Sequence, residues 1–180
     1  MDAKRPGRGR TTAASDWATV EIRTTIHAPL PFVFRWCTDY SAEDGRLAQE
    51  RYTRRLLERG PRQVLFEDLE ETPRGWVWKR THVDLHPPDH WHAESEGNYR
   101  YYRLDYRLQA RPDGSTELLL RGERRATALG GRNPSRARLQ RELRALWARL
   151  GRALEREYRG TLRRSGARGP RGSSRVERPA

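Results

Sequence analysis

The sequence predicts an α+β domain in which a curved, seven-stranded antiparallel sheet wraps around a long C-terminal helix, with two short helices after the first strand. Three observations support this prediction. Alternating segments joined by short turns fill residues 52–127. One apolar stripe at spacings of three and four follows along residues 133–162. The length of 180 residues is enough for one domain with a sizeable core and too short for two comfortable ones.

The first strand and the two short helices come from residues 17–48. Residues 17–27 alternate, with Glu21 and Arg23 on one face. The other face carries Ala18, Val20, Ile22, Thr24 and Ile26. Prolines 29 and 31 end this strand. A helix that starts near Pro31 is indicated by the helical spacing of Phe32, Val33, Trp36, Cys37 and Tyr40. The segment Ser41-Ala42-Glu43-Asp44 matches a capping box and predicts the second helix.

Six further strands, joined by short turns, form an antiparallel meander. We expect them at residues 52–59, 62–71, 75–85, 90–96, 99–110 and 115–127. Pro112-Asp113-Gly114 suits a three-residue hairpin, which sets Leu108 opposite Leu118 and Tyr106 opposite Leu120. Gly97-Asn98 suits a two-residue turn, which sets Ala93 opposite Tyr102 and Trp91 opposite Leu104. Both turns place the apolar residues on one face of the sheet.

The last predicted element is a long amphipathic helix. Asn133 is the expected N-cap and Pro134 the first helical residue, and the helix should end near Leu162, before Gly166. Its apolar stripe comprises Leu139, Leu143, Leu146, Trp147, Leu150, Leu154 and Tyr158. Such a stripe must be buried, and the one-faced sheet is the surface available for it.

The domain is therefore expected at residues 17–162, between a disordered basic segment at 1–16 and a disordered Arg-rich tail at 163–180. About half of the net charge of +13 lies in these two ends, so nucleic-acid binding is possible but not the favoured interpretation. No apolar run approaches the length of a membrane span, and no secretory signal begins the chain. The single cysteine, Cys37, fits a reducing cytoplasm.

The order of the elements resembles the START-like superfamily. This superfamily, also called Bet v 1-like or SRPBCC, includes polyketide cyclases and dehydrases, lipid-transport proteins and coenzyme-Q-binding proteins. The similar segments are Ile26-His27-Ala28-Pro29 with Phe32-Val33-Phe34, Thr38-Asp39-Tyr40, and Gly75-Trp76-Val77-Trp78 through Pro87-Pro88-Asp89-His90-Trp91. The resemblance implies a helix-grip fold whose cavity, between sheet and long helix, holds an apolar small molecule or lipid. The family has no universal catalytic motif, so no catalytic residue is implied.

Rings with polar tips on the inner face could line such a pocket or could fill the core, and the resemblance favours the pocket. The predicted ligand-binding residues are Asp68, Lys79, Thr81, Val83, Trp91, Ala93, Tyr102, Leu104, Tyr106, Leu143, Trp147 and Leu150. Asp68 and Lys79 could form a polar feature at the end of the pocket. The favoured interpretation is a salt bridge at the rim of little energetic weight, because a one-residue error in register would put Glu67 and Arg80 inside instead.

Other chemistry is less well supported by the sequence. His82, His86, His90 and His92 do not have the spacing of a zinc site, so exposed histidines are favoured over a metal site. Cys37 is interpreted as a small core residue rather than a nucleophile. We expect that the protein binds an apolar small molecule or lipid. We expect no cofactor. The alternatives are an enzyme of polyketide cyclase or aromatase type, and an interaction protein whose basic tail docks on RNA, ribosomes or anionic membranes.

Overall fold

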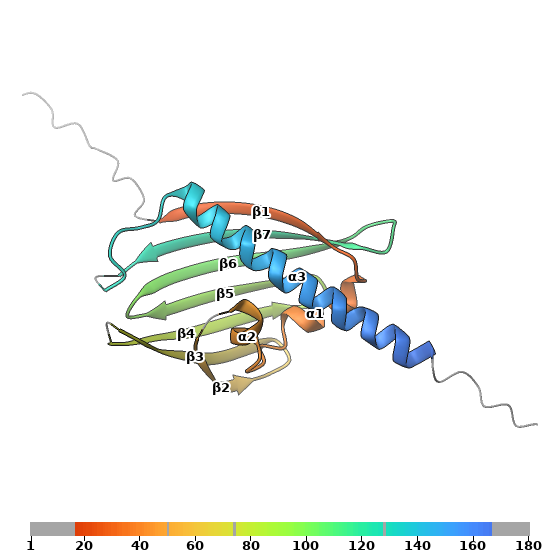
Figure 1. Cartoon of the computed structure of the whole chain (residues 1–180), viewed down its shortest axis with the longest axis horizontal. Coiled ribbons are helices and arrows are strands. Elements are labelled where there is room, and N and C mark those ends of the chain that lie inside the picture. Colours follow the sequence, from red (N-terminus) through yellow and green to blue (C-terminus); the bar gives the residue numbers. More distant parts are fainter. Residues whose placement is uncertain (1–16, 50, 74, 128, 167–180) are drawn as a thin grey trace, which may run out of the picture.

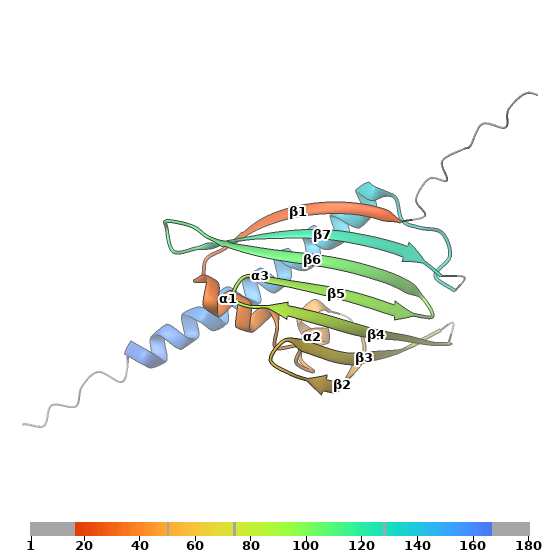
Figure 2. The same cartoon turned by 180° about the vertical axis from the view of Figure 1, so that it is seen from behind.

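The computed structural model describes residues 17–49, 51–73, 75–127 and 129–166. Seven strands form one antiparallel sheet in the order β1-β7-β6-β5-β4-β3-β2, which confirms the predicted α+β fold. The strands are β1 (Ala18–Ile26), β2 (Thr53–Arg59), β3 (Gln63–Thr72), β4 (Gly75–His86), β5 (His90–Gly97), β6 (Arg100–Ala110) and β7 (Thr116–Ala126). The sheet curves around a long helix, α3 (Arg136–Gly166), which crosses it diagonally (Figure 1). Seen from behind, the outer face of the sheet lies in front of α3 (Figure 2).

Helix α3 buries the predicted stripe against the sheet. Leu139, Trp147 and Leu154 are buried, and Leu143, Leu150 and Tyr158 pack against the core. The predicted start is wrong by a few residues, because Asn133 accepts a hydrogen bond from the Ala126 amide and so holds the end of β7. Ser135 stands at the helix start instead, and its hydroxyl accepts from the Arg138 amide at 3.3 Å.

The helix also extends past its predicted end to Gly166. Leu162, Arg163 and Arg164 are good helix formers, and the arginines suit the negative end of the helix dipole. Residues 163–166 therefore belong to α3. The segments 1–16 and 167–180, which were expected to be disordered, lie outside the described residues. In the described part of the chain, no helix has the length and apolar character that a membrane crossing requires.

The strand registers confirm one predicted hairpin and correct the other. Between β6 and β7, Tyr106 lies opposite Leu120 and Leu108 opposite Leu118, as predicted. Between β5 and β6, the predicted pairs of Trp91 with Leu104 and of Ala93 with Tyr102 are wrong by two residues. Trp91 lies opposite Tyr106, Ala93 opposite Leu104, and Ser95 opposite Tyr102. A shift of two residues keeps every side chain on its predicted face.

The shift arises because Gly97 belongs to β5 rather than to the turn. Gly97 lies opposite Lys79, and a Cβ atom at this position would lie 2.3 Å from the Trp78 carbonyl oxygen. Asn98 then extends the pairing with its side chain. Its Oδ1 accepts from the Trp78 amide at 3.0 Å, and its Nδ2 donates to the Trp76 carbonyl at 2.8 Å.

Two short helices cover one end of the concave face, α1 (Leu30–Cys37) and α2 (Asp44–Ala48) (Figure 1). Helix α1 buries Val33 and also Phe34, whose ring meets Trp91 edge-on at a centroid distance of 5.9 Å. Ser41 does not cap α2 at a backbone amide, because its hydroxyl donates to the Asp44 carboxylate at 3.3 Å. Both helices are present where the sequence predicts them.

Gly122 lets α3 approach the sheet closely. It faces inward on β7, where a Cβ atom would lie 3.2 Å from the Leu104 side chain and 3.5 Å from the Leu143 side chain. Leu143 therefore occupies space that a side chain on β7 would otherwise take. The helix and the sheet are therefore closest on the β7 side of the sheet, and the space between them lies toward β4, β5 and β6.

Candidate functional site

A cavity of about 560 Å³ lies between the concave face of the sheet and α3. This volume is in the usual range for small-molecule sites. Strands β2 to β7 supply its floor, α3 covers it, and the two short helices close one side. The lining contains eight aromatic side chains: Trp36, Tyr40, Tyr52, Phe66, Trp91, Tyr102, Tyr106 and Trp147.

The apolar end of the cavity is built from stacked rings. Trp91 and Tyr106 lie opposite each other on β5 and β6, and their rings stack in parallel at a centroid distance of 4.6 Å. Trp147 of α3 meets Tyr106 at 5.8 Å. Burial raises the pKa of Tyr106, so its hydroxyl stays protonated and can donate a hydrogen bond. Flat aromatic walls with a hydroxyl donor suit a flat apolar ligand.

The cavity becomes more polar along the strands, because the pairing aligns side chains in rows across the sheet. The row through Tyr106 and Trp91 continues to Leu120 and Leu85. A polar row, four residues further along each strand, contains Arg124, Tyr102, Ser95 and Thr81. The next row holds Lys79, Asp68 and Arg54. Successive rows on one face are about 7 Å apart, so the gradient spans the length of a small molecule.

Arg54 is the centre of a buried polar network at this end. Its Nε and Nη2 donate to the two oxygens of Asp68 at 2.7 and 3.1 Å, and its Nη1 donates to Asp44. The guanidinium lies 4.0 Å from the centre of the Phe66 ring. Burial lowers the pKa of Arg54, but the hydrogen bonds to Asp68 and the charges of Asp68 and Asp44 together outweigh burial, so the net pKa is raised. Arg54 is permanently charged.

A hydroxyl pair lies beside this network. Thr81 on β4 and Ser95 on β5 are both buried, and their hydroxyl oxygens are 2.8 Å apart. Because both residues are buried, this bond supplies each hydroxyl with a partner in the protein. The pair lines the middle of the cavity floor and separates the aromatic end from the charged end.

Arg124 links the sheet to α3 on the opposite side of the cavity. It is 3% exposed, and its Nη1 donates to Glu142 at 2.9 Å. Two more arginines line the wall. Arg100 donates to the Tyr99 hydroxyl at 3.1 Å, and Arg149 donates to the Ala48 carbonyl at 2.9 Å. The Nε atoms of these three arginines are buried and have no hydrogen-bond partner among the described residues.

Two acidic or nucleophilic groups in the lining are shifted toward their neutral forms. Burial raises the pKa of Asp44, even though Arg54 lowers it in part. Burial also raises the pKa of the Cys37 thiol, and the charges of Asp39 and Asp44 raise it further. Cys37 is only partly buried and lines the cavity, so it is not purely a core residue as expected, but a thiol that stays protonated is a poor nucleophile.

Ten of the twelve predicted ligand-binding residues line the cavity, and the exceptions are Val83 and Asp68. Val83 is fully buried in the floor below the lining. Asp68 lies behind Arg54 and Lys79. The Nζ of Lys79 is 3.0 Å from the Asp68 carboxylate. Asp68 is 4% exposed and the Lys79 side chain is 31% exposed, so only one partner of the predicted rim salt bridge is buried. Glu67 and Arg80, the residues expected inside after a register error, pair on the outer face.

Sequence reasoning missed the arginines of the wall. Arg124 follows Leu118 and Leu120 on the same face of β7, and Arg100 precedes Tyr102 on the same face of β6, so the alternation already contained the signal. Arg54 had no such signal, because charged residues occupy both faces of β2. Trp36 and Asp44 come from the short helices and Tyr40 from the segment between them, and their positions depend on tertiary packing that strand periodicity does not encode.

Three of the four histidines of β4 and β5 lie beside carboxylates, and the fourth, His86, stacks on the His90 ring at a centroid distance of 5.1 Å. His90 lies 2.8 Å from Asp105, and His92 lies 3.4 Å from Glu94. Within the described ranges, no group of three or more His, Cys, Asp or Glu residues is placed to hold a metal ion.

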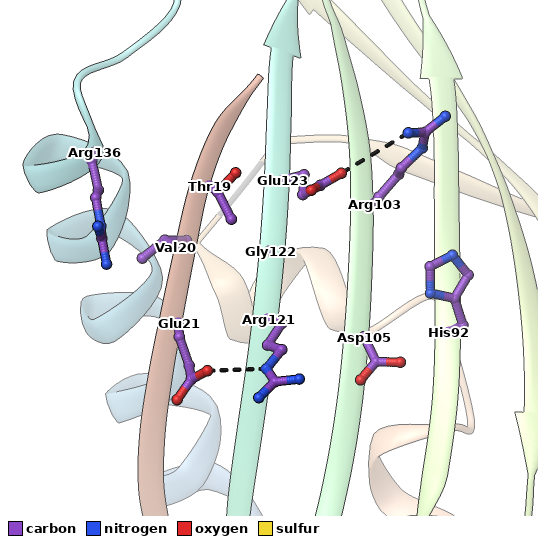
Figure 3. A pocket seen from close by; sticks show the side chains of 10 residues that line it. All are labelled: Thr19, Val20, Glu21, His92, Arg103, Asp105, Arg121, Gly122, Glu123 and Arg136. Carbon is purple, nitrogen blue, oxygen red and sulfur yellow. Dashed lines mark hydrogen bonds and ion pairs between the residues drawn. The ribbon is translucent and has the colours of Figure 1, made fainter. Parts of the chain in front are cut away.

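A second hollow of about 480 Å³ lies at the β1, β7 and β6 side of the sheet (Figure 3). Its rim consists of charged side chains that already pair with one another. Arg121 donates to Glu21 at 3.0 Å, and Arg103 lies 3.9 Å from Glu123. None of its ten lining residues is a tryptophan, tyrosine or phenylalanine. We therefore take the inner cavity as the candidate site.

The sequence matches no protein-family model and no curated protein. Solved structures do resemble the fold. The Zhui aromatase/cyclase from a Streptomyces species is 16% identical over 86% of this chain and 99% of that chain, with a TM-score of 0.57. TTHA0849 from Thermus thermophilus is 16% identical over 79% and 98%, with a TM-score of 0.59. Ara h 8.0201 is 11% identical over 77% and 97%, with a TM-score of 0.58. The chain therefore has the helix-grip fold that these solved structures share.

Proposed function

We propose that the protein binds an apolar small molecule or lipid in the cavity between the sheet and α3. The observation that carries the proposal is the aromatic end of the cavity, where Trp91, Tyr106 and Trp147 meet. Apolar ligands gain free energy roughly in proportion to the area they bury against such walls. Likeness to helix-grip proteins supports the same proposal. We place the protein in the cytoplasm, because Cys37 is its single cysteine.

The proposal is tested with N-phenyl-1-naphthylamine, a neutral probe whose fluorescence rises in apolar surroundings. We expect saturable binding by the wild-type protein. The variant Ala93→Phe places a ring in the cavity floor and should weaken this binding by about tenfold or more, which corresponds to about 1.4 kcal/mol. Glu94→Phe, on the outer face of the same strand, is the matched control and should bind the probe normally.

Native mass spectrometry of protein purified from its own host gives an independent test. A co-purifying apolar molecule would support the proposal and would identify the ligand. Absence of both a co-purifying molecule and saturable probe binding would refute it. Equal loss of probe binding in Ala93→Phe and Glu94→Phe would count against this cavity as the site.

A second candidate function is ring closure of a polyketide-like substrate, as in an aromatase or cyclase. The observation that favours it is Asp44, a cavity carboxyl whose pKa is raised by burial and which contacts Arg54. Such a group is suited to accept and return a proton. The reaction would take a proton from a carbon between two carbonyls, join that carbon to a third carbonyl carbon, and protonate the resulting alkoxide.

The test for this candidate uses a linear poly-β-carbonyl compound and chromatographic detection of the cyclised product. Asp44→Asn should abolish product formation while it still binds the neutral naphthylamine probe. If the wild-type protein forms product no faster than the protein-free control, this candidate fails and the binding function is unaffected.

A further inference from the structure

We infer that the ligand is an amphipathic acid, whose oxyanionic head group, a carboxylate or its equivalent, is held by Arg100 and Arg124 while its apolar body lies against Trp91 and Tyr106. This inference rests on the proposed binding function and adds the chemical class of the ligand. Four observations carry it: a buried arginine with a free donor, a second arginine beside it, an excess of cations in the wall, and the polarity gradient along the strands.

Arg124 is the first of these. It is almost completely buried and lies 5.8 Å from the Tyr102 ring, with one nitrogen bonded to Glu142. Its Nε has no acceptor among the residues that the structure describes. A buried N–H group without an acceptor is unfavourable, and an oxyanion in the cavity would supply one. The guanidinium fork matches the geometry of a carboxylate.

Arg124 lies opposite Tyr102, and Arg100 lies two residues before Tyr102 on β6. Arg100 is therefore the diagonal neighbour of Arg124 on the same face of the sheet. Arg100 donates to the Tyr99 hydroxyl, and its own Nε lacks an acceptor in the described part of the chain. Diagonal neighbours on adjacent strands lie within reach of one head group when both side chains are long. Two guanidinium groups thus flank one end of the cavity.

The cavity wall as a whole favours an anion. Its basic lining side chains are Arg54, Lys79, Arg100, Arg124 and Arg149, and its acidic ones are Asp44 and Glu142. Asp68, behind the lining, neutralises one further charge by pairing with Arg54 and Lys79. The remaining excess is positive and lies in a space of reduced dielectric constant, where it attracts an acid more strongly than surface charges do.

The rows of the sheet set the orientation of such a ligand. The aromatic row lies at one end of the cavity floor, and the row with Arg124 lies four residues further along the strands, about 13 Å away. A ligand that spans this distance would place its apolar part on Trp91 and its charge between the two arginines. A neutral ligand of the same shape would leave both donors without an acceptor.

Two probes with the same ring system test the inference. 1-Anilinonaphthalene-8-sulfonate differs from N-phenyl-1-naphthylamine only by its sulfonate group. We expect the sulfonate to bind about tenfold more tightly than the neutral probe, as charge-assisted hydrogen bonds would give. Arg100→Gln should reduce the ratio of the two probe affinities from about tenfold to about twofold or less. Arg121→Gln, on the outer face of β7, is the control and should change neither affinity.

Arg124→Gln provides a second variant, and circular dichroism establishes whether it folds. If it does, it should lose the same advantage as Arg100→Gln; if it does not fold, Arg100→Gln decides alone. Equal affinities for the two probes, or an unchanged ratio in Arg100→Gln, would overturn the inference while the binding function stands. An equal loss in Arg121→Gln would overturn it too, because binding would then follow surface charge. Failure of both probes to bind would instead remove the proposed function itself.

Discussion

The guanidinium of Arg54 forms a bidentate pair with the carboxylate of Asp68, and both side chains are less than one-tenth exposed. These residues lie opposite each other on β2 and β3. The pair anchors the edge strand to the sheet. Since neither charge is solvated, each depends on the other for its stabilisation.

Asp68→Ala should therefore destabilise the protein by about 3–5 kcal/mol, because it leaves the Arg54 charge buried with fewer acceptors. The measurement is the free energy of unfolding in urea. Glu67→Ala, which breaks the exposed pair with Arg80 on the neighbouring position, is the control and should change this free energy by less than about 1 kcal/mol. A similar effect of both substitutions would show that burial of the pair is unimportant.

Gly97→Ala should destabilise the protein by about 1–3 kcal/mol, because the added methyl group would meet the Trp78 carbonyl, a backbone atom with little freedom to move. Gly151→Ala is the matched substitution in α3, where nothing lies within 4 Å of the new atom. It should stabilise the protein by about 0.5–1 kcal/mol through helix propensity. Thermal melts of the two variants should shift in opposite directions, and a stable Gly97→Ala protein would contradict the observed strand pairing.

Thr81→Val and Ser95→Ala should each destabilise the protein by about 1–2 kcal/mol, because each leaves a buried hydroxyl without its partner. The double variant should be more stable than the sum of the single effects predicts, since it removes both groups together. A double-mutant cycle from urea unfolding measures this coupling. Strict additivity would mean that the two hydroxyls do not bond to each other.

Glu142 should make the protein sensitive to acid. Burial raises its pKa, but hydrogen bonds from Arg138 and Arg124 outweigh burial and hold the pKa below the ordinary value of 4.5. A carboxyl with a lowered pKa contributes stability above its unfolded pKa, and this contribution is lost as the pH falls through the folded pKa. Glu142→Gln should thus be about 1 kcal/mol less stable at neutral pH and equally stable in acid. A constant difference between pH 7 and pH 3 would contradict the prediction.

Much of the fold follows from the sequence because its signals are local. The turn Pro112-Asp113-Gly114 sets the register of β6 and β7, and the stripe of α3 selects the face that meets the sheet. The β5–β6 register could not be read in the same way. There the Gly97-Asn98 pair has the composition of a tight turn, but Gly97 is required by close approach to β4, which is a tertiary contact.

The cavity was partly predictable for the same reason. Alternation placed Tyr102, Leu104 and Tyr106 on the inner face, and all three line the cavity. The burial of polar side chains near the strand ends was harder to predict, since arginine is also common at strand ends that are exposed to solvent. Whether Arg54 or Arg124 is solvated or buried depends on how far α2 and α3 extend over the sheet, which no strand pattern specifies.

Gly122 gives the fold a way to adjust its interior without replacing any side chain that faces the ligand. Gly122 has no side chain, so the size of the residue at this position sets how closely Leu143 and α3 approach β7. A bulkier residue here would act as a wedge and lift the helix on that side. One substitution at this position, in the row of the sheet next to Tyr106 and Trp91, would therefore change the size of the cavity in a related chain.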